Sequence, residues 1–505
     1  MSLTETKVVG SPEQEAFWKA LVDGESHLIL EARAGSGKTF SCIEGSKRYM
    51  EKHDGRVIMV AYNKSIASEL EAKVPEGVEA CTMHSLGFKA IRDAVGKVKV
   101  DGWKTANLLE DMYGSREAVE NVSPTFATNM KKVVSLAKNT MLPLDFSDAD
   151  FNDLVIHYNL QLNGDESVIR DMLMAVLVAS RNQVDVIDFD DMIWLPLVKE
   201  WDLPQYDLMF VDEAQDLNKS RQLLAMAAAS RLVLVGDPKQ AIYGFTGADA
   251  YSMTNMENIL HAYDIGCEVL PLTVSRRCPK SHVAKAQEIV ADIQAMDEAP
   301  EGTINSVNAS DLPEVLSGGE LVLCRMNAPL MKVAYQLIQN DTPVAIQGRD
   351  IGTGLANLCK KIAKKKMSMD IIQFLDAMEL YTMKEVERLD RRALVRRVSQ
   401  SQYEMLHDRL SCITIISQGL STVGDLVDRL KALFTDTDKS KKNRKVLLSS
   451  VHRAKGLEAD KVFILEPQMM PHPMAELEWE QDQEMNIKYV ALTRSLDTLT
   501  FVITE

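Results

Sequence analysis

The chain has 505 residues, more than one comfortable hydrophobic core, and its length predicts roughly two to four domains. Its 57 lysine and arginine residues against 73 aspartate and glutamate residues give a formal net charge of −16. This charge excludes an arginine-rich tail as the main way of binding a partner, although a local basic groove stays open. No apolar run approaches the ~18 residues of a membrane span, and the first residues lack a signal peptide's apolar segment. We therefore expect a cytoplasmic protein.

Short apolar runs rich in Val, Ile and Leu recur along the chain and predict buried parallel strands. Helix-forming stretches separate them, so the pattern indicates an α/β fold. The predicted strands are residues 27–32, 56–62, 208–213, 231–237, 320–325 and 461–467. Two long stretches with helical periodicity interrupt this alternation, residues 88–184 and residues 351–442, and we interpret both as helical insertions.

A phosphate-binding loop follows the first predicted strand, and it reads Ala32-Arg33-Ala34-Gly35-Ser36-Gly37-Lys38-Thr39. Strand, glycine-rich loop and helix stand here in the order of a Walker A site, although Ala32 replaces the first glycine of the usual pattern. Gly35 and Gly37 allow backbone N–H groups to close around phosphates. Lys38 is expected at the β and γ oxygens, and the Thr39 hydroxyl at Mg²⁺. The loop therefore predicts ATP and Mg²⁺ as ligands.

Two further segments complete a nucleotide site. Residues 206–216 contain an apolar run that is followed by Asp212 and Glu213. We expect Asp212 near the Mg²⁺ ion and Glu213 as the base that orients and deprotonates an attacking water; solvated acids at a strand end are the alternative. Residues 231–249 carry Gln240, whose side-chain amide can report whether the terminal phosphate is present.

The segments DEAQD and VGDPKQAIYGFTGAD resemble motifs II and III of the UvrD/Rep/PcrA branch of superfamily 1 DNA helicases. Other segments resemble the remaining motifs in the family's order, from SPEQEAF at 11–17 to QEMNIKYVALTRS at 483–495. The matches span nearly the whole chain. The resemblance implies two RecA-like P-loop domains, each a parallel sheet flanked by helices, with helical insertion domains.

The resemblance also implies the domain limits. The first RecA-like domain, 1A, is expected at residues 1–87 and 185–272, with insertion 1B at 88–184. The second, 2A, is expected at residues 273–350 and 443–505, with a short insertion 2B at 351–442.

By resemblance, ATP binds between the two RecA-like domains, with Gln14 at the adenine and Glu458 at the ribose. Phe40 and Arg276 stand where the family has an arginine and a tyrosine, so the contacts to the base depart from the family pattern. The residues expected to act in hydrolysis are Lys38, Glu213, Gln240, Arg277 and Arg494, the last as an arginine finger. The other expected ATP contacts are Ala34, Gly35, Ser36, Gly37, Thr39, Phe40, Arg276 and Gly456.

Single-stranded DNA is the expected track of such a motor. The candidate contacts are Tyr62, Thr82, His84, Tyr243, Phe245 and His452. Aromatic rings stack on bases without reading sequence, although core packing is the alternative for the three aromatic residues and a satisfied buried position for the two histidines. The basic runs at 360–366 and 388–397 are either solvated helix faces or contacts to duplex phosphates.

The sequence thus predicts an ATP- and Mg²⁺-dependent DNA helicase or single-strand translocase, by resemblance moving 3′ to 5′, in DNA replication, repair or recombination. We expect a monomer that acts on single-stranded DNA and single-strand/duplex junctions beside replication or recombination proteins. The chain length suggests a compact version, such as a phage encodes, in a prokaryotic or phage-infected cell. One alternative is a translocase that strips proteins from DNA, as an anti-recombinase, with little unwinding. Another is an ATP-gated loading module for a replication partner, against which the intact Glu213 and Arg494 argue.

Overall fold

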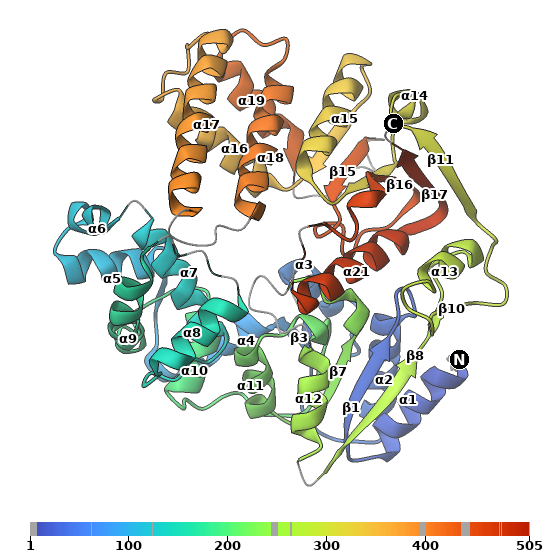
Figure 1. The fold of residues 1–505 in the computed structure, drawn as a ribbon. Helices are drawn as coiled ribbons and strands as arrows, with labels where there is room; N and C mark the ends of the chain where they lie inside the picture. Colours follow the sequence, from blue (N-terminus) through green and yellow to red (C-terminus); the bar gives the residue numbers. More distant parts are fainter. Residues whose placement is uncertain are drawn as a thin grey trace. The chain divides into compact units, whose positions relative to one another are not determined.

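The structure, a computed structural model, describes residues 8–61, 63–123, 125–158, 160, 162, 164–243, 251–262, 265–393, 400–435, 445–473, 475 and 477–503. The chain folds as two units, Met1–Thr273 and Val274–Glu505. Each unit holds a parallel β-sheet with helices packed against it (Figure 1). The predicted α/β class with two helix-flanked parallel sheets is therefore confirmed, whereas the finer domain limits stay predictions. None of the described helices combines the length and apolarity needed to cross a membrane.

The first unit is built on a six-stranded sheet with the order β3-β2-β6-β7-β1-β8, in which all neighbours run parallel. Its strands are β1 (His27–Ala32), β2 (Val57–Ala61), β3 (Val78–Thr82), β6 (Tyr206–Val211), β7 (Ala229–Gly236) and β8 (Cys267–Leu272). The predicted strands at 27–32, 56–62, 208–213 and 231–237 correspond to the four inner strands. The two edge strands, β3 and β8, are partly exposed and so lack the continuous apolar run of a buried strand.

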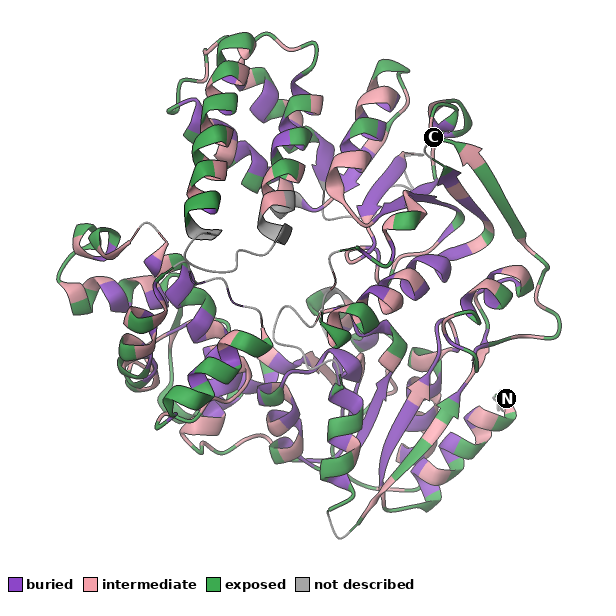
Figure 2. Ribbon diagram, viewed as in Figure 1, coloured by how far each residue is buried: buried purple, intermediate pink, exposed green. Residues whose placement is uncertain are grey.

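Alternate residues of this sheet point to opposite faces, and each face carries its own apolar core. The inner strands are buried over most of their length (Figure 2). Leu28 and Leu30 of β1 pack with Phe17 on one face, whereas Ile29 packs with Leu224 on the other. The helices of the first face are α1 (Pro12–Asp23), α2 (Lys38–Met50) and α3 (Lys64–Glu71). Those of the second face are α4 (Met83–Val95), α10 (Asp191–Val198), α11 (Lys219–Ala228) and α12 (Ser252–Leu260). Burial on both faces explains why the inner strands are mostly apolar, with polar residues such as Asp207 of β6 and Arg231 of β7 near their starts.

Between β3 and β6 the chain forms a helical region with a core of its own. Its helices are α5 (Lys104–Tyr113), α6 (Arg116–Val122), α7 (Phe126–Asn139), α8 (Asp148–His157) and α9 (Glu166–Asn182). The short parallel pair β4 (Lys99–Val100) and β5 (Val186–Ile187) joins its two ends. Phe126, Phe151 and Leu173 lie in a cluster distinct from the two sheet cores. This separate core lets the helices pack without residues of the sheet.

A buried ion cluster joins this helical region to the start of α10. Lys104 Nζ donates to Asp191 Oδ2 at 2.7 Å, and Lys138 Nζ lies 2.8 Å from Asp191 Oδ1 and 2.7 Å from Asp188 Oδ2. The side chains of Lys104, Lys138 and Asp191 are fully buried. Removing one partner would leave the others as uncompensated buried charges, which costs more than the pair contributes.

The cluster makes Asp191 a sensitive point of the first unit. Replacing Asp191 with alanine should lower the free energy of unfolding by about 3–5 kcal/mol, because two buried ammonium groups lose a carboxylate. Chemical denaturation followed by tryptophan fluorescence measures this, since Trp194 is buried with the Lys138 Nζ 5.5 Å from its ring.

The matched control is Glu120→Gln, which removes an exposed ion pair with Arg116 on α6. It should leave the unfolding midpoint almost unchanged, because exposed pairs contribute little. An Asp191→Ala protein that unfolds at the control's midpoint would contradict the assignment of the cluster.

The second unit is built on a seven-stranded parallel sheet with the order β11-β17-β16-β12-β15-β13-β14. Its strands are β11 (Thr303–Asn308), β12 (Leu321–Cys324), β13 (Val344–Gln347), β14 (Phe434–Thr435), β15 (Val446–Ser450), β16 (Ala459–Leu465) and β17 (Ser495–Ile503). The pair β9 (Val274–Ser275) and β10 (Gln294–Ala295) precedes it. Helices α13 (Lys280–Ala286), α14 (Leu312–Val315), α15 (Asn327–Gln339) and α21 (Glu478–Leu492) accompany the strands. The predicted strands at 320–325 and 461–467 are β12 and β16.

A second helical region lies between β13 and β15. It consists of α16 (Arg349–Ile362), α17 (Ile371–Ala393), α18 (Gln400–Ser417) and α19 (Val423–Leu433). Unlike the first helical region, it shares one apolar core with its sheet, since Phe374 and Ile413 cluster with Val322 and Leu448. Asp408 of α18 also accepts the Ala328 N–H at 2.6 Å and so caps α15. The region is thus an integral part of the second unit.

Candidate active site

Three adjacent strands of the first sheet bring the predicted nucleotide motifs together. Strands β6, β7 and β1 are neighbours and run parallel, so their carboxyl ends meet at one edge of the sheet. Asp212 and Glu213 follow β6, Asp237 follows β7, and the loop 33–37 follows β1. The predicted phosphate loop, carboxylate pair and Gln240 segment therefore lie side by side.

The loop after β1 has the backbone of an anion site. Gly35 and Gly37 adopt φ angles of 74° and 88°, a left-handed conformation that favours glycine. Gly37 caps the amino end of α2, where N–H groups and the helix dipole attract anions. The Ser36 hydroxyl is buried and has no hydrogen-bond partner among the described residues. Ala32 is the last residue of β1 rather than part of the turn, which explains why this position tolerates a side chain.

Lys38 and Glu213 form an ion pair at the mouth of this loop. The distance from Lys38 Nζ to Glu213 Oε1 is 3.4 Å, and both side chains are partly buried. Glu213 has a φ of 54°, uncommon for a residue other than glycine, and its N–H donates to Asp212 Oδ1 at 2.9 Å. The Gln215 side-chain amide donates to the second oxygen of Glu213. Both oxygens of the predicted base are therefore held by specific partners.

The predicted Mg²⁺ ligands are a hydroxyl and a carboxylate, the oxygen ligands that a hard cation prefers. Thr39 is exposed in the first turn of α2, and Asp212 follows β6 at the same edge. Within the described ranges, no three His, Cys, Asp or Glu residues are grouped to hold a metal on their own. Because Mg²⁺ is commonly held by one or two protein oxygens together with phosphates, the Thr39–Asp212 pair fits an ion that arrives with the nucleotide.

Asp237 is the centre of a buried polar network beside the loop. Its carboxylate accepts from Gln240 Nε2 at 2.7 Å and lies 3.4 Å from Arg33 Nη1. Its backbone N–H donates to Gln215 Oε1 at 3.1 Å. Asp237 is completely buried, and Gln215 and Gln240 are nearly so. The sequence predicted no role for Arg33 or Gln215. One signal was present for Arg33, which is a charged residue in a loop otherwise made of small residues.

Gln14, the predicted adenine contact, joins the first two helices. Its Nε2 donates to Ser41 Oγ at 2.9 Å, and its Oε1 accepts the Ser11 N–H at 3.0 Å in a capping box. The ring of Phe40 in α2 lies edge-on to the ring of Trp18 in α1, with 6.3 Å between the centroids. Because Phe40 is 46% exposed while Gln14 is 1% exposed, Phe40 offers the larger surface to a base.

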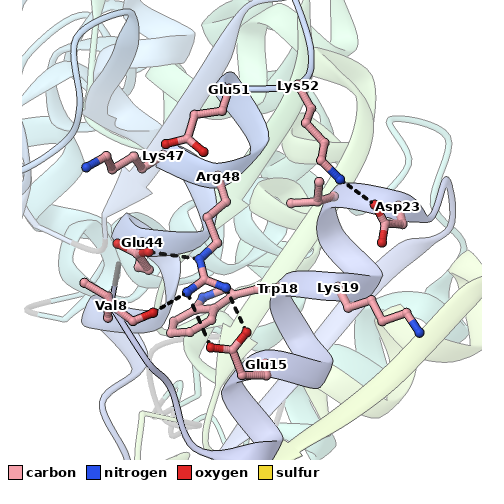
Figure 3. Close-up of a pocket in the computed structure, with 11 residues that line it drawn as sticks. Val8, Glu15, Trp18, Lys19, Asp23, Glu44, Lys47, Arg48, Glu51 and Lys52 are labelled. Atoms are coloured by element: carbon pink, nitrogen blue, oxygen red, sulfur yellow. Dashed lines mark hydrogen bonds and ion pairs between the residues drawn. The ribbon is translucent and has the colours of Figure 1, made fainter. Parts of the chain in front are cut away.

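A groove of about 390 Å³ lies between α1 and α2 and is lined by residues of these helices and of the adjoining chain, not of the phosphate loop. Figure 3 shows that some of its charged side chains pair with one another. Arg48 lies 3.9 Å above the Trp18 ring and bonds to Glu15 at 2.8 Å and Glu44 at 2.9 Å. The groove therefore braces α1 against α2, and with it the Gln14 helix against the phosphate-loop helix.

Of the predicted DNA residues of the first unit, Thr82 and His84 lie at the end of β3 and the start of α4, whereas Tyr243 comes after β7. Thr82 ends β3, and its hydroxyl accepts the Ser85 N–H at 3.1 Å to cap α4. His84 is partly buried and lies edge-on to Phe189 at 6.5 Å between centroids. Phe189 is 61% exposed and was not predicted, because it stands alone among polar residues after β5. Tyr243 is partly buried, whereas Tyr62 and Phe245 lie outside the described residues.

Of the predicted residues of the second unit, Gly456 and Glu458 precede β16 and Arg494 precedes β17, whereas His452 follows β15. Arg277 Nε lies 2.8 Å from Glu458 Oε2, which brings together the predicted phosphate and ribose contacts. Arg494 is 1% exposed, and its Nε donates to the Val490 carbonyl at 2.9 Å. Gly456 is exposed with a φ of 88°. Arg276 is also exposed. The reach of Arg277 and Arg494 toward nucleotide on the first unit stays a prediction.

The two histidines among the predicted DNA contacts have depressed pKa values. Burial, with a smaller contribution from Arg325, lowers the pKa of His452 to about 3. Burial, with a smaller contribution from Arg221, lowers the pKa of His84 to about 4. Both rings are therefore neutral at physiological pH and would contact DNA as hydrogen-bonding or stacking groups, not as cations.

The depressed pKa of His452 gives a pH dependence of stability. The folded protein keeps this ring neutral, while the unfolded chain protonates it below pH ~6.5, so stability is full above that pH and falls as the pH drops toward 3. His452→Gln should remove up to ~1.4 kcal/mol per pH unit from this slope. Unfolding of both proteins between pH 7.5 and 5 tests it; equal slopes would show that burial does not hold the ring neutral.

Fold and site together define a P-loop nucleotide-binding protein with two helix-flanked parallel sheets. The sequence model of the UvrD/REP helicase N-terminal domain matches residues 13–261, and that of the UvrD-like helicase C-terminal domain matches residues 146–505. The chain therefore belongs to the UvrD-like helicases, a family of ATP-dependent DNA helicases.

Curated relatives agree with this family. The F-box DNA helicase protein 1 of Schizosaccharomyces pombe is 22% identical over 97% of this chain and 58% of its own length. The ATP-dependent DNA helicase PcrA of Staphylococcus epidermidis is 23% identical over 94% of this chain and 81% of its own length. The F-box DNA helicase 1 of Gallus gallus is 26% identical over 49% of this chain and 25% of its own length. This chain thus spans little more than half of the first relative.

Proposed function

We propose that the protein is an ATP-dependent motor that moves 3′ to 5′ along single-stranded DNA and unwinds duplexes at single-strand/duplex junctions. One observation carries the proposal: a single sheet edge presents the phosphate loop, Glu213 and Gln240 on β1, β6 and β7, and Thr82 at the end of β3. A motor must couple ATP hydrolysis to movement on DNA. ATP and DNA contacts at the same edge of one sheet would allow a change at the ATP site to reach the DNA contacts.

The residues of the first unit divide the chemistry of hydrolysis among them. Lys38 would hold the β and γ oxygens, and Thr39 and Asp212 would hold Mg²⁺, which supplies charge neutralisation when bound. Glu213 would orient the attacking water and take its proton. In the structure Glu213 is paired with Lys38, and phosphate oxygens would compete for that ammonium. Nucleotide binding would then release one Glu213 oxygen for water.

The second unit would contribute positive charge to the transferred phosphoryl group. Arg494 is held by the Val490 carbonyl and by the Thr493 hydroxyl at 3.1 Å, so its guanidinium is fixed before any substrate binds. A preorganised cation of this kind acts mainly in the transition state. We therefore assign Arg494 as the arginine finger and Arg277 as a second phosphate contact.

Two substitutions in the site should separate the effect on ATP binding from the effect on ATP hydrolysis. Lys38→Ala should weaken both ATP binding and hydrolysis, whereas Glu213→Gln should keep ATP affinity and lose hydrolysis, because an amide cannot accept the proton. Titration with a fluorescent ATP analogue and steady-state ATPase rates measure the two effects. Near-normal turnover in Glu213→Gln would show that another group is the base.

The proposed DNA contacts can be tested at Phe189, whose exposed ring lies edge-on to His84. Phe189→Ala should weaken single-stranded DNA binding by about 1–3 kcal/mol if the ring stacks on a base. Basal ATPase should persist, since no nucleotide residue is changed, while stimulation by DNA and unwinding fall together. The control is Ile156→Ala, which removes a 72% exposed apolar side chain on α8. An equal effect of both changes on DNA affinity would exclude base stacking by Phe189.

Strand displacement on 3′-tailed, 5′-tailed and blunt duplexes tests direction and activity. Unwinding of the 3′-tailed substrate alone supports the proposal, and unwinding of the 5′-tailed substrate alone reverses the polarity. Removal of a protein bound to single-stranded DNA without unwinding would favour the protein-stripping translocase instead.

A further inference from the structure

Asp237 is completely buried, and a buried carboxylate must be compensated. Its oxygens receive the Lys239 N–H at 3.1 Å, Gln240 Nε2 at 2.7 Å and the guanidinium of Arg33, with Nη1 at 3.4 Å. Arg33 is the positive side chain of this set, and it comes from the phosphate loop, 204 positions earlier in the chain. The phosphate loop is thereby tied electrostatically to the segment that carries Gln240.

The backbone of Arg33 is fixed to both the loop and the sheet. Its N–H donates to the Leu272 carbonyl at 2.8 Å on the edge strand β8, and its carbonyl accepts the Ser36 N–H at 3.1 Å. The side chain is only 11% exposed, and Nη2 lies 3.5 Å from Glu31 Oε2. Arg33 is therefore directed into the protein rather than toward solvent.

A second branch of the network leads to Glu213. Gln215 accepts the Asp237 N–H through Oε1 at 3.1 Å and donates through Nε2 to Glu213, so one amide bridges the two strand ends. A β-carbon at Gly236 would overlap the Gln215 side-chain oxygen, which shows how closely the bridge is packed. The network therefore connects Glu213 and Gln240 through a single buried aspartate.

We propose that Arg33 and Gln215 are positioning residues that hold Asp237, and through it keep Gln240 and Glu213 in fixed relation. The proposal rests on the proposed hydrolysis of ATP at this site. Neither residue is assigned a contact to nucleotide. Their loss should therefore lower the turnover of bound ATP much more than the affinity for ATP.

The test compares four single variants and one double variant by steady-state ATPase kinetics, affinity for a fluorescent ATP analogue with Mg²⁺, and melting temperature. Arg33→Met keeps the stem and removes the charge, while Arg33→Lys keeps the charge. Gln215→Leu removes the bridge. Arg231→Met is the control, because Arg231 is an equally buried arginine on β7 that donates to backbone carbonyls of Leu21 and Ser26.

Arg33→Met and Gln215→Leu should each lower kcat by about 10- to 100-fold, as losses of supporting contacts commonly do, with ATP affinity changed less than about threefold. Arg33→Lys should recover most of the rate. The double variant Arg33→Met with Gln215→Leu should be little slower than the worse single variant, because residues of one network are not additive. Arg231→Met should lower the melting temperature and leave the kcat of the folded protein unchanged.

Three results would overturn the inference. An affinity loss as large as the rate loss in Arg33→Met would make Arg33 a phosphate ligand. A double variant whose loss equals the product of the single losses would show two independent residues. A melting-temperature loss with unchanged kcat, as in Arg231→Met, would make the network only structural. By contrast, a wild-type protein without ATPase, or full turnover in Lys38→Ala, would refute the proposed function itself.

Discussion

The parallel pairing of β6, β7 and β1 is the constraint on which the rest of the site depends. Parallel neighbours end at the same edge, so three segments up to 204 positions apart, from Arg33 to Asp237, contribute adjacent residues. The pairing is held by burial of both sheet faces, which makes the inner strands mostly apolar, and the carboxylates Asp212, Glu213 and Asp237 come directly after strands. Each of these strands thus contributes packing residues along its length and candidate site residues at its carboxyl end.

The two helical regions relate to their sheets in different ways. The first has its own apolar core and is fastened to α10 by the Lys104–Asp191–Lys138 ion cluster. The second shares the core of its sheet, and Asp408 of α18 caps a helix that packs on that sheet. The apolar cluster of the first region includes Ile91 of α4 and Trp194 of α10, two helices that pack on the sheet. Movement of either region would therefore expose apolar surface.

Most of the central fold follows from the sequence, because a strand buried on both faces leaves a continuous apolar run. The edge strands β3 and β8 do not, since half-exposed strands mix polar and apolar residues. The predicted phosphate loop and carboxylate pair meet for the same reason, as motif spacing and strand ends are local properties. Phe189 was missed because its proximity to His84 spans 105 positions and arises only from the helical region between them.

The sequence around Gln14 fits two interpretations, one structural and one functional. Ser-x-x-Gln before an apolar run is a capping box, and the same residues match a helicase motif at the adenine. In the structure both polar ends of the Gln14 side chain bond to protein, to Ser11 and to Ser41 of the phosphate-loop helix. Adenine recognition by this amide would require at least one of these bonds to be exchanged. That exchange would reach α2, whose amino end would receive the phosphates. Base recognition and phosphate binding would then be coupled through Ser41, and Phe40, its neighbour in the chain, offers the adjoining apolar surface. A base that cannot engage Gln14 would bind through phosphates alone and leave the link between α1 and α2 unchanged.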